Sequence, residues 1–185
     1  MIRLIENGIM KILTVFSLAP GIRLNRKSLQ EKTGLNNIML DKALNILLNF
    51  KILQKEKNLF SINHQNENAK KLITRAAESY NKLKQLPLKE YFMITDIIKE
   101  LAEIKNIGEV YLFGSYSKLV FKESSDVDIA VISDSADKKR VNLVIHKLEK
   151  KYNKKIEIHQ FSKGFYSNKK DPLVKDIIQN GVKLI

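Results

Sequence analysis

The stretch that decides the fold is VYLFGSYSKLVFKESSDVDIAVI, residues 110–132. It begins and ends with short apolar runs, Val110–Phe113 and Ile129–Ile132, which are rich in β-branched and aromatic residues. Such runs predict two buried strands. Between them lie Gly114-Ser115 and, ten residues further along, Ser125-Asp126-Val127-Asp128. Polar residues therefore follow the first strand and begin the second, and these are the candidates for chemistry.

Asp126 and Asp128 are spaced i, i+2, so on a strand their carboxylates project from the same face. Such a pair can hold a divalent cation, although Asp-x-Asp is also common in turns. A Gly114-Ser115 turn after a strand leaves backbone amides free to hold phosphate at the start of the next helix. Metal and phosphate together indicate nucleotidyl transfer.

The segment from Leu112 to Ile129, with Asp171–Val182 near the C-terminus, resembles the signature of the DNA polymerase β-like nucleotidyltransferase superfamily, especially its minimal prokaryotic branch. The shared pattern is a strand, Gly-Ser, Asp-x-Asp on the neighbouring strand and a closing helix. The resemblance implies an α/β (α+β) nucleotidyltransferase fold over residues 108–185, with a small mixed sheet and helices. One position departs from the pattern: Leu119 stands where members usually carry a second glycine.

The resemblance also implies a site with two Mg²⁺ ions and an NTP substrate, most simply ATP. Asp126 and Asp128 would coordinate both ions, and a third carboxylate would come from a later adjacent strand. In the predicted strand over residues 155–161 the candidate is Glu157, because Ile156 and Ile158 face the opposite side. Glu157 would then be the general base. The alternative is an exposed glutamate paired with Lys154 or Lys155.

His159 shares the face of Glu157 and could line the cleft, although a lone histidine is more often structural. Gly114 would let the backbone approach the phosphates, and Ser115 would donate to one of them. Lys118 would neutralise β/γ-phosphate charge, or else be a solvated surface lysine. Ser125 belongs to the same candidate set, although stabilising the turn before the strand is its more ordinary role.

Residues 1–65 predict a winged helix-turn-helix domain. A first helix ends at Pro20-Gly21, Asn25 caps a second over 26–33 that Gly34 ends, and Asn36 or Asn37 caps a third. The apolar face of the third helix is predicted from Met39, Ala43, Ile46, Leu47 and Phe50. Two short strands, 52–55 and 59–62, then form a hairpin.

In a DNA-binding winged helix the third helix enters the major groove. The outward candidates on this helix are Asn37, Asp41, Lys42, Asn45 and Asn49. The lysines that could contact phosphates are Lys42, Lys51, Lys55 and Lys57. Two features count against DNA reading: the third helix has no arginine, and Asp41 near its start would repel phosphate. A dimer or protein-docking module is the alternative, and a homodimer is possible.

Residues 66–107 predict a connection of two helices, about 69–86 and 88–105, separated by Pro87. The C-terminal unit is expected to alternate strand 110–113, helix from about 115, strand 127–132, helix 137–152, strand 155–161, helix 172–180 and end strand 182–185. Asp171 should cap the last helix, with Pro172 at its first position and Gly181 after its end.

The composition is strongly basic, with a net charge of +13, and lysine predominates over arginine. This charge suits a nucleic-acid partner, but a lysine-rich composition alone explains it equally well. The chain has no cysteine, which excludes disulfides and thiolate chemistry. Lys11 interrupts the N-terminal apolar run, so we expect a buried helix, a cytoplasmic protein and no membrane partner.

Two functions from different classes are compatible with these patterns. The first is a metal-dependent nucleotidyltransferase acting on a hydroxyl of a protein, RNA or small molecule, directed by a DNA-binding winged helix. The second is a transcriptional regulator, or the antitoxin of a toxin partner, whose nucleotidyltransferase domain is weak or inactive. Leu119 in place of glycine favours the second function.

Overall fold

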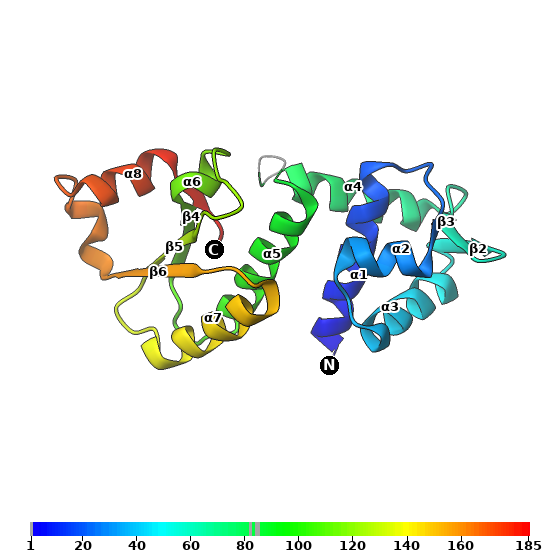
Figure 1. Ribbon diagram of the computed structural model, residues 1–185, viewed down its shortest axis with the longest axis horizontal. Helices are drawn as coiled ribbons and strands as arrows, with labels where there is room; N and C mark the ends of the chain where they lie inside the picture. Colours follow the sequence, from blue (N-terminus) through cyan, green and yellow to red (C-terminus); the bar gives the residue numbers. More distant parts are fainter. Residues whose placement is uncertain (1, 82, 84–85) are drawn as a thin grey trace. The chain divides into compact units, whose positions relative to one another are not determined.

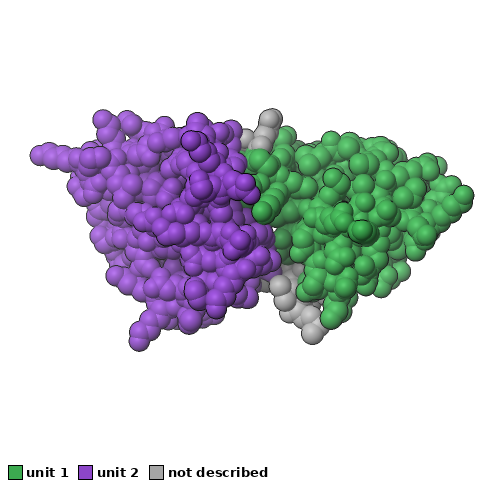
Figure 2. Space-filling model, viewed as in Figure 1, with its two compact units in different colours: residues 1–92 green, residues 93–185 purple. Residues whose placement is uncertain are grey.

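The computed structural model describes residues 2–81, 83 and 86–185 and divides the chain into two compact units, Met1–Phe92 and Met93–Ile185 (Figures 1 and 2). The boundary falls inside α5 (Leu88–Ala102), within the segment predicted to connect the two domains. Among the described residues, no helix combines the length and apolarity needed to cross a membrane.

The first unit contains α1 (Ile2–Leu18), β1 (Leu24–Asn25), α2 (Arg26–Thr33), α3 (Asn37–Asn49), β2 (Leu53–Glu56), β3 (Leu59–Ile62) and α4 (Glu67–Asn81). Strands β2 and β3 pair as an antiparallel hairpin, and β1 adds to the free edge of β3. The predicted order of three helices and a hairpin is therefore present (Figure 1). Its assignment as a winged helix stays a prediction. The expected helix over 69–86 ends at Asn81, and residues 82, 84 and 85 lie outside the described residues.

Asparagine caps begin two of these helices. The side chain of Asn25 accepts from the Ser28 amide, and that of Asn36 accepts from the Met39 amide, so Asn36 rather than Asn37 caps α3. Gly34 ends α2 at a φ of +64°, a conformation that glycine adopts without steric cost. The caps predicted from sequence at Asn25 and Gly34 are confirmed.

The buried face of α3 differs in part from the predicted one. Its buried residues are Leu40, Ala43, Leu44 and Leu47. Phe50, predicted to lie on the same face, is 71% exposed. It is the residue after the last helical turn, where the 3.6-residue period no longer fixes side-chain direction. The prediction for Phe50 is wrong for that reason.

The second unit is built on a four-stranded mixed sheet in the order β6-β5-β4-β7 (Figure 1). Its strands are β4 (Glu109–Phe113), β5 (Val127–Ile132), β6 (Ile156–Phe161) and β7 (Val182–Lys183). Only β5 and β6 run parallel, because α7 (Lys138–Tyr152) crosses between them; the other pairs are antiparallel. The small mixed sheet predicted from sequence is present.

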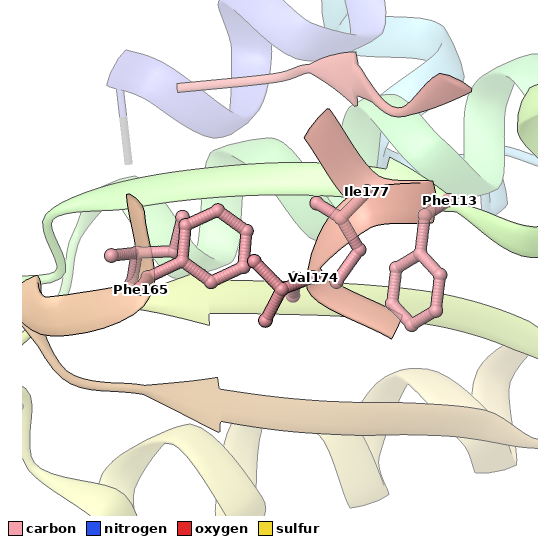
Figure 3. Close-up of a cluster of buried hydrophobic side chains, with 6 residues drawn as sticks. Phe113, Phe165, Val174 and Ile177 are labelled. Carbon is pink, nitrogen blue, oxygen red and sulfur yellow. The ribbon is translucent and has the colours of Figure 1, made fainter. Parts of the chain in front are cut away.

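Three further segments complete the second unit: α6 (Gly114–Ser117), the 3₁₀ turn η1 (Lys163–Ser167) and α8 (Pro172–Asn180). Asp171 caps α8 by accepting from the Leu173 amide at 2.8 Å, as predicted. Buried Phe165, Val174 and Ile177 pack with Phe113 against one face of the sheet (Figure 3). This hydrophobic core covers one end of the sheet face, and the carboxylates of Asp128 and Glu157 lie on the rest of the same face.

Candidate active site

Strand pairing places two carboxylates and an imidazole side by side. In the parallel register of β5 and β6, Asp128 lies opposite Glu157, and Ala130 lies opposite His159. Because alternate residues share a face, Asp128, Glu157 and His159 all project from the same side of the sheet. One potential ligand atom from each of the three lies within 4.8 Å of the others. The sheet therefore builds a compact group of metal-ligating side chains.

The bend after β4 lies directly against this group. Phe113, the last residue of β4, is opposite Asp128 in the antiparallel register, and Gly114 follows at a φ of +67°. A Cβ atom added to Gly114 would lie only 2.1 Å from Asp128 Oδ2. Glycine is therefore required here twice, for its backbone conformation and for the space that the carboxylate occupies.

Burial and repulsion both act on Asp128. Burial raises the pKa of its carboxyl, the nearby Glu157 carboxylate raises it further, and His159 partly opposes this rise. The ionised carboxylate is thus incompletely compensated by the protein's own groups. A divalent cation between Asp128 and Glu157 would supply the missing positive charge.

Asp126 stands apart from this group and is held by a lysine. Its Oδ2 accepts from Lys155 Nζ at 2.8 Å, and the same Nζ lies 3.9 Å from Glu157 Oε2. These carboxylates raise the pKa of Lys155, so its ammonium group stays charged. The alternative considered for Glu157, a pairing with Lys155, is therefore present together with its approach to Asp128.

The predicted phosphate-binding residues have other partners as well. Lys118 Nζ lies 2.8 Å from Asp176 Oδ1 and links α6 to α8. Ser125 Oγ accepts from the Lys122 amide at 2.8 Å, which is the turn-stabilising role. Ser115 follows Gly114 in α6, and its carbonyl accepts from the Val120 amide. Only Gly114 and Ser115 of this set lie at the bend itself.

Leu119 occupies the position of the missing glycine, and its backbone has the conformation that a glycine would favour. Its φ is +58°, which costs an L-residue roughly 1–2 kcal/mol. Leu119 is 46% exposed and Val120 is 68% exposed, so the loop presents apolar side chains to solvent. Phe121 anchors the loop by stacking on buried Tyr116, with ring centroids 4.2 Å apart.

The family model described as polymerase beta, nucleotidyltransferase matches residues 95–185. These residues form a polymerase beta-like nucleotidyltransferase domain. The match contains the bend at Gly114, the carboxylates of β5 and β6, and the core around Phe165. The family expected from the sequence motifs is thus confirmed for this part of the chain.

Solved structures that are similar to part of the chain include two toxin–antitoxin structures. A toxin–antitoxin crystallised with AMP-PNP is 25% identical over 50% of this chain and 72% of its own, with a TM-score of 0.38. A mutant of the toxin–antitoxin MntA-HpeT is 23% identical over 50% of this chain and 71% of its own, with a TM-score of 0.37. No curated protein matches the chain.

Sequence reasoning undervalued two residues around the site of the nucleotidyltransferase domain. The sequence favours a structural role for His159, although its spacing from Glu157 places both residues on the same face of a strand. The sequence offers Lys155 as a partner of Glu157, whereas the shorter contact of Lys155 is with Asp126. The place of His159 could be predicted from its spacing in the sequence. The contact of Lys155 could not, because it depends on the path of a long flexible side chain.

The predicted DNA-contacting residues lie in the first unit, where α2 contributes an arginine that the sequence did not single out. Arg26 makes two hydrogen bonds to Asp41, and its Nη2 donates to Asn37 Oδ1 at 3.0 Å. This contact holds the pKa of Asp41 below its usual range and offsets its charge. Asn37 is therefore committed within the protein, whereas Lys42 and Asn45 are exposed on α3.

The hairpin carries the remaining two candidates. Lys55 Nζ lies 5.4 Å from the centroid of the Phe60 ring, and Lys57 stands at a φ of +54° in the turn between β2 and β3. A surface hollow next to them is lined by Asn25, Arg26, Lys27, Lys55, Asn58 and Phe60. Cationic side chains from α2 and the hairpin thus gather on one surface of this unit.

Proposed function

We propose that the nucleotidyltransferase domain transfers a nucleoside monophosphate from an NTP to a hydroxyl acceptor in a metal-dependent reaction. The observation that carries this proposal is the approach of Asp128 and Glu157 to each other beside the bend at Gly114. Carboxylate oxygens are the preferred ligands of Mg²⁺ and Mn²⁺. Bound there with the triphosphate, such a cation would neutralise charge that develops at the phosphates.

The protein groups have separate roles in this reaction. Asp128 and Glu157 would hold the cation, and Glu157 would also accept the proton of the attacking hydroxyl. The acceptor oxygen bonds to the α-phosphorus while the bond between that phosphorus and the bridging oxygen breaks, so pyrophosphate leaves with the electron pair. Gly114 and Ser115 present backbone amides to the phosphates. Lys118 would contact the phosphates by exchanging Asp176 for them, whereas Asp126 stays paired with Lys155 beside the site.

We propose ATP as the nucleotide to test first, with a protein, RNA or small-molecule hydroxyl as acceptor. Lysates incubated with each α-³²P-labelled NTP identify both nucleotide and acceptor. Transfer should disappear with Asp128→Ala and persist with Glu123→Gln, a nearby exposed carboxylate outside the site. Labelling that survives Asp128→Ala would place the activity elsewhere.

We propose further that residues 1–65 act as a winged helix-turn-helix that directs the enzyme to DNA. This segment carries ten Lys plus Arg and four Asp plus Glu, a net charge of +6. The Arg26 contact offsets the charge of Asp41, which was the main objection to phosphate contact by α3. Lys42, Asn45, Lys55 and Lys57 are exposed and available. Binding should weaken steeply with salt, and Lys42→Ala should reduce the salt slope.

The second candidate is a transcriptional regulator or an antitoxin with a weak nucleotidyltransferase domain. Two observations favour it: Leu119 presents an exposed apolar side chain at the glycine position, and Lys155 engages Asp126. The regulator requires salt-dependent binding to its own promoter without label transfer. The antitoxin requires a complex with a toxin partner that forms equally well with Asp128→Ala. A homodimer is compatible with either candidate.

A further inference from the structure

His159 is the unexpected neighbour of the carboxylates. Its Nε2 lies 3.5 Å from Glu157 Oε1, and all three candidate ligand atoms lie within 4.8 Å of one another. Two ligand atoms on one transition-metal ion are separated by up to about 4 Å, twice a metal–ligand bond of about 2.0–2.2 Å. The His159–Glu157 pair already satisfies this limit, and Asp128, whose ligand atom lies within 4.8 Å of both, would have to move closer to join them.

The ring of His159 is held in place by the core. Its centroid lies 5.2 Å from that of Phe113 in an edge-to-face arrangement, and the Phe113 side chain is buried. The His159 side chain is 28% exposed, so one edge of the ring remains open to the site. An imidazole positioned in this way loses little conformational freedom when it binds a cation.

Lys155 places a permanent positive charge in the same site. Its ammonium group contacts Asp126 at 2.8 Å and lies 3.9 Å from Glu157. Like charges within a few ångströms repel appreciably even near a protein surface. As long as Lys155 holds Asp126, the position next to that carboxylate is occupied by an ammonium group rather than by a metal ion.

We infer that this site binds a single first-row transition-metal ion through Asp128, Glu157 and His159, and that Lys155 takes the place of a second ion beside Asp126. Imidazole suits Fe²⁺, Ni²⁺, Cu²⁺ and Zn²⁺, and Mn²⁺ accepts it beside carboxylates, whereas Mg²⁺ prefers oxygen and keeps its waters. The nitrogen of His159 therefore selects against Mg²⁺. This inference replaces the two Mg²⁺ ions expected from the family resemblance; it does not require that transfer takes place.

Mn²⁺ added to the nucleotide-free chain of residues 1–185 tests the ligand set directly. Pulsed electron paramagnetic resonance should detect ¹⁴N coupling from a directly bound imidazole, and calorimetry should give one equivalent of Mn²⁺. The His159→Ala variant should lose the nitrogen coupling and at least about tenfold in Mn²⁺ affinity, with a smaller loss for Mg²⁺. His146→Ala is the matched control, because His146 is 67% exposed on α7 and contacts Glu149 instead.

Lys155→Met tests the second half of the inference. Removing the ammonium group should release Asp126 and raise the Mn²⁺ stoichiometry from one to two. Lys154→Met should leave it at one, because Lys154 contacts the Glu123 carbonyl and the Tyr116 ring and none of the proposed ligands. Wild-type protein that binds Mn²⁺ without nitrogen coupling, or that binds two equivalents, overturns the inference.

The result is separable from the proposed function. Nitrogen coupling without any nucleotide transfer would leave the metal site standing and refute the enzyme. Transfer with Mg²⁺ and no nitrogen ligand would do the reverse.

Discussion

Replacing Gly114 by alanine should cost about 1.5–3.5 kcal/mol of unfolding free energy in the nucleotidyltransferase domain and also displace Asp128, a proposed metal ligand. The residue stands at a φ of +67°, which costs an L-residue about 1–2 kcal/mol. The new Cβ would lie 2.1 Å from Asp128 Oδ2 and 3.0 Å from its Cγ. The carboxylate must rotate away, and an off-rotamer side chain costs about 0.5–1.5 kcal/mol more.

A double-mutant cycle separates these two contributions. In an Asp128→Ala background the clash is absent, so Gly114→Ala should cost only the backbone part, about 1–2 kcal/mol. Hydrogen exchange followed by mass spectrometry measures the free energy of opening of each unit separately. Gly34→Ala is the control: its φ is +64°, and nothing lies within 4 Å of the added Cβ, so it should destabilise only the first unit.

Mn²⁺ affinity completes this test. Gly114→Ala should weaken binding because it moves Asp128, and Gly34→Ala should not change it. An unchanged Mn²⁺ affinity in Gly114→Ala, or an equal stability cost with and without Asp128, would refute the reasoning that the bend and the carboxylate compete for the same space.

Three further changes have defined outcomes. Because the pKa of Asp128 is raised in the folded protein, its ionisation destabilises the fold as pH rises through that pKa. At pH 7, metal-free Asp128→Asn should therefore melt at a higher temperature than the wild type. A lower melting temperature of the variant would contradict this. Phe165→Ala should lower the free energy of unfolding by about 3–5 kcal/mol, measured by urea unfolding, because its ring is buried in the core of the second unit. A loss below about 1 kcal/mol would contradict this and would mean that the core closes around the smaller side chain. The pKa of Glu109 is lowered mainly by its contact with Lys183 and next by that with Tyr166, so its contribution to folding stability is present above pH 4.5 and lost as pH falls through the lowered pKa. The difference in unfolding free energy between the wild type and Glu109→Gln should therefore shrink from pH 7 to pH 4. A constant difference would show that these contacts do not stabilise the fold.

The elements of the second unit followed from local patterns in the sequence. Short continuous apolar runs predicted the strands around Val110–Phe113 and Ile129–Ile132, and Asp171, followed by Pro172, predicted the start of the last helix. The family resemblance called for a third carboxylate on a later strand, and the alternation of side chains there selected Glu157, which the structure pairs with Asp128. These strands, the helix cap and the face of Glu157 depend on residues close together in sequence or on the alternation of side chains along a strand, and both can be read from the sequence.

The contacts made by long charged side chains could not be predicted in the same way. Arg26 reaches Asp41 across 15 residues of chain, and Lys155 reaches Asp126 across 29. Several lysines were equally available to Asp126, and only the folded backbone decides among them. The positive φ of Leu119 could not be predicted from the sequence either, because leucine disfavours the backbone conformation that the loop imposes.

Transfer from the carboxylate site is tested most directly with ATP labelled at either its α- or its γ-phosphate, incubated with the purified protein, Mn²⁺ and the acceptor fraction. The acceptor should retain the α label, release pyrophosphate and take up no γ label, and Glu157→Gln should abolish the α labelling. Acceptor that carries the γ label, or that is labelled equally well by Glu157→Gln, would contradict nucleotidyl transfer at this site.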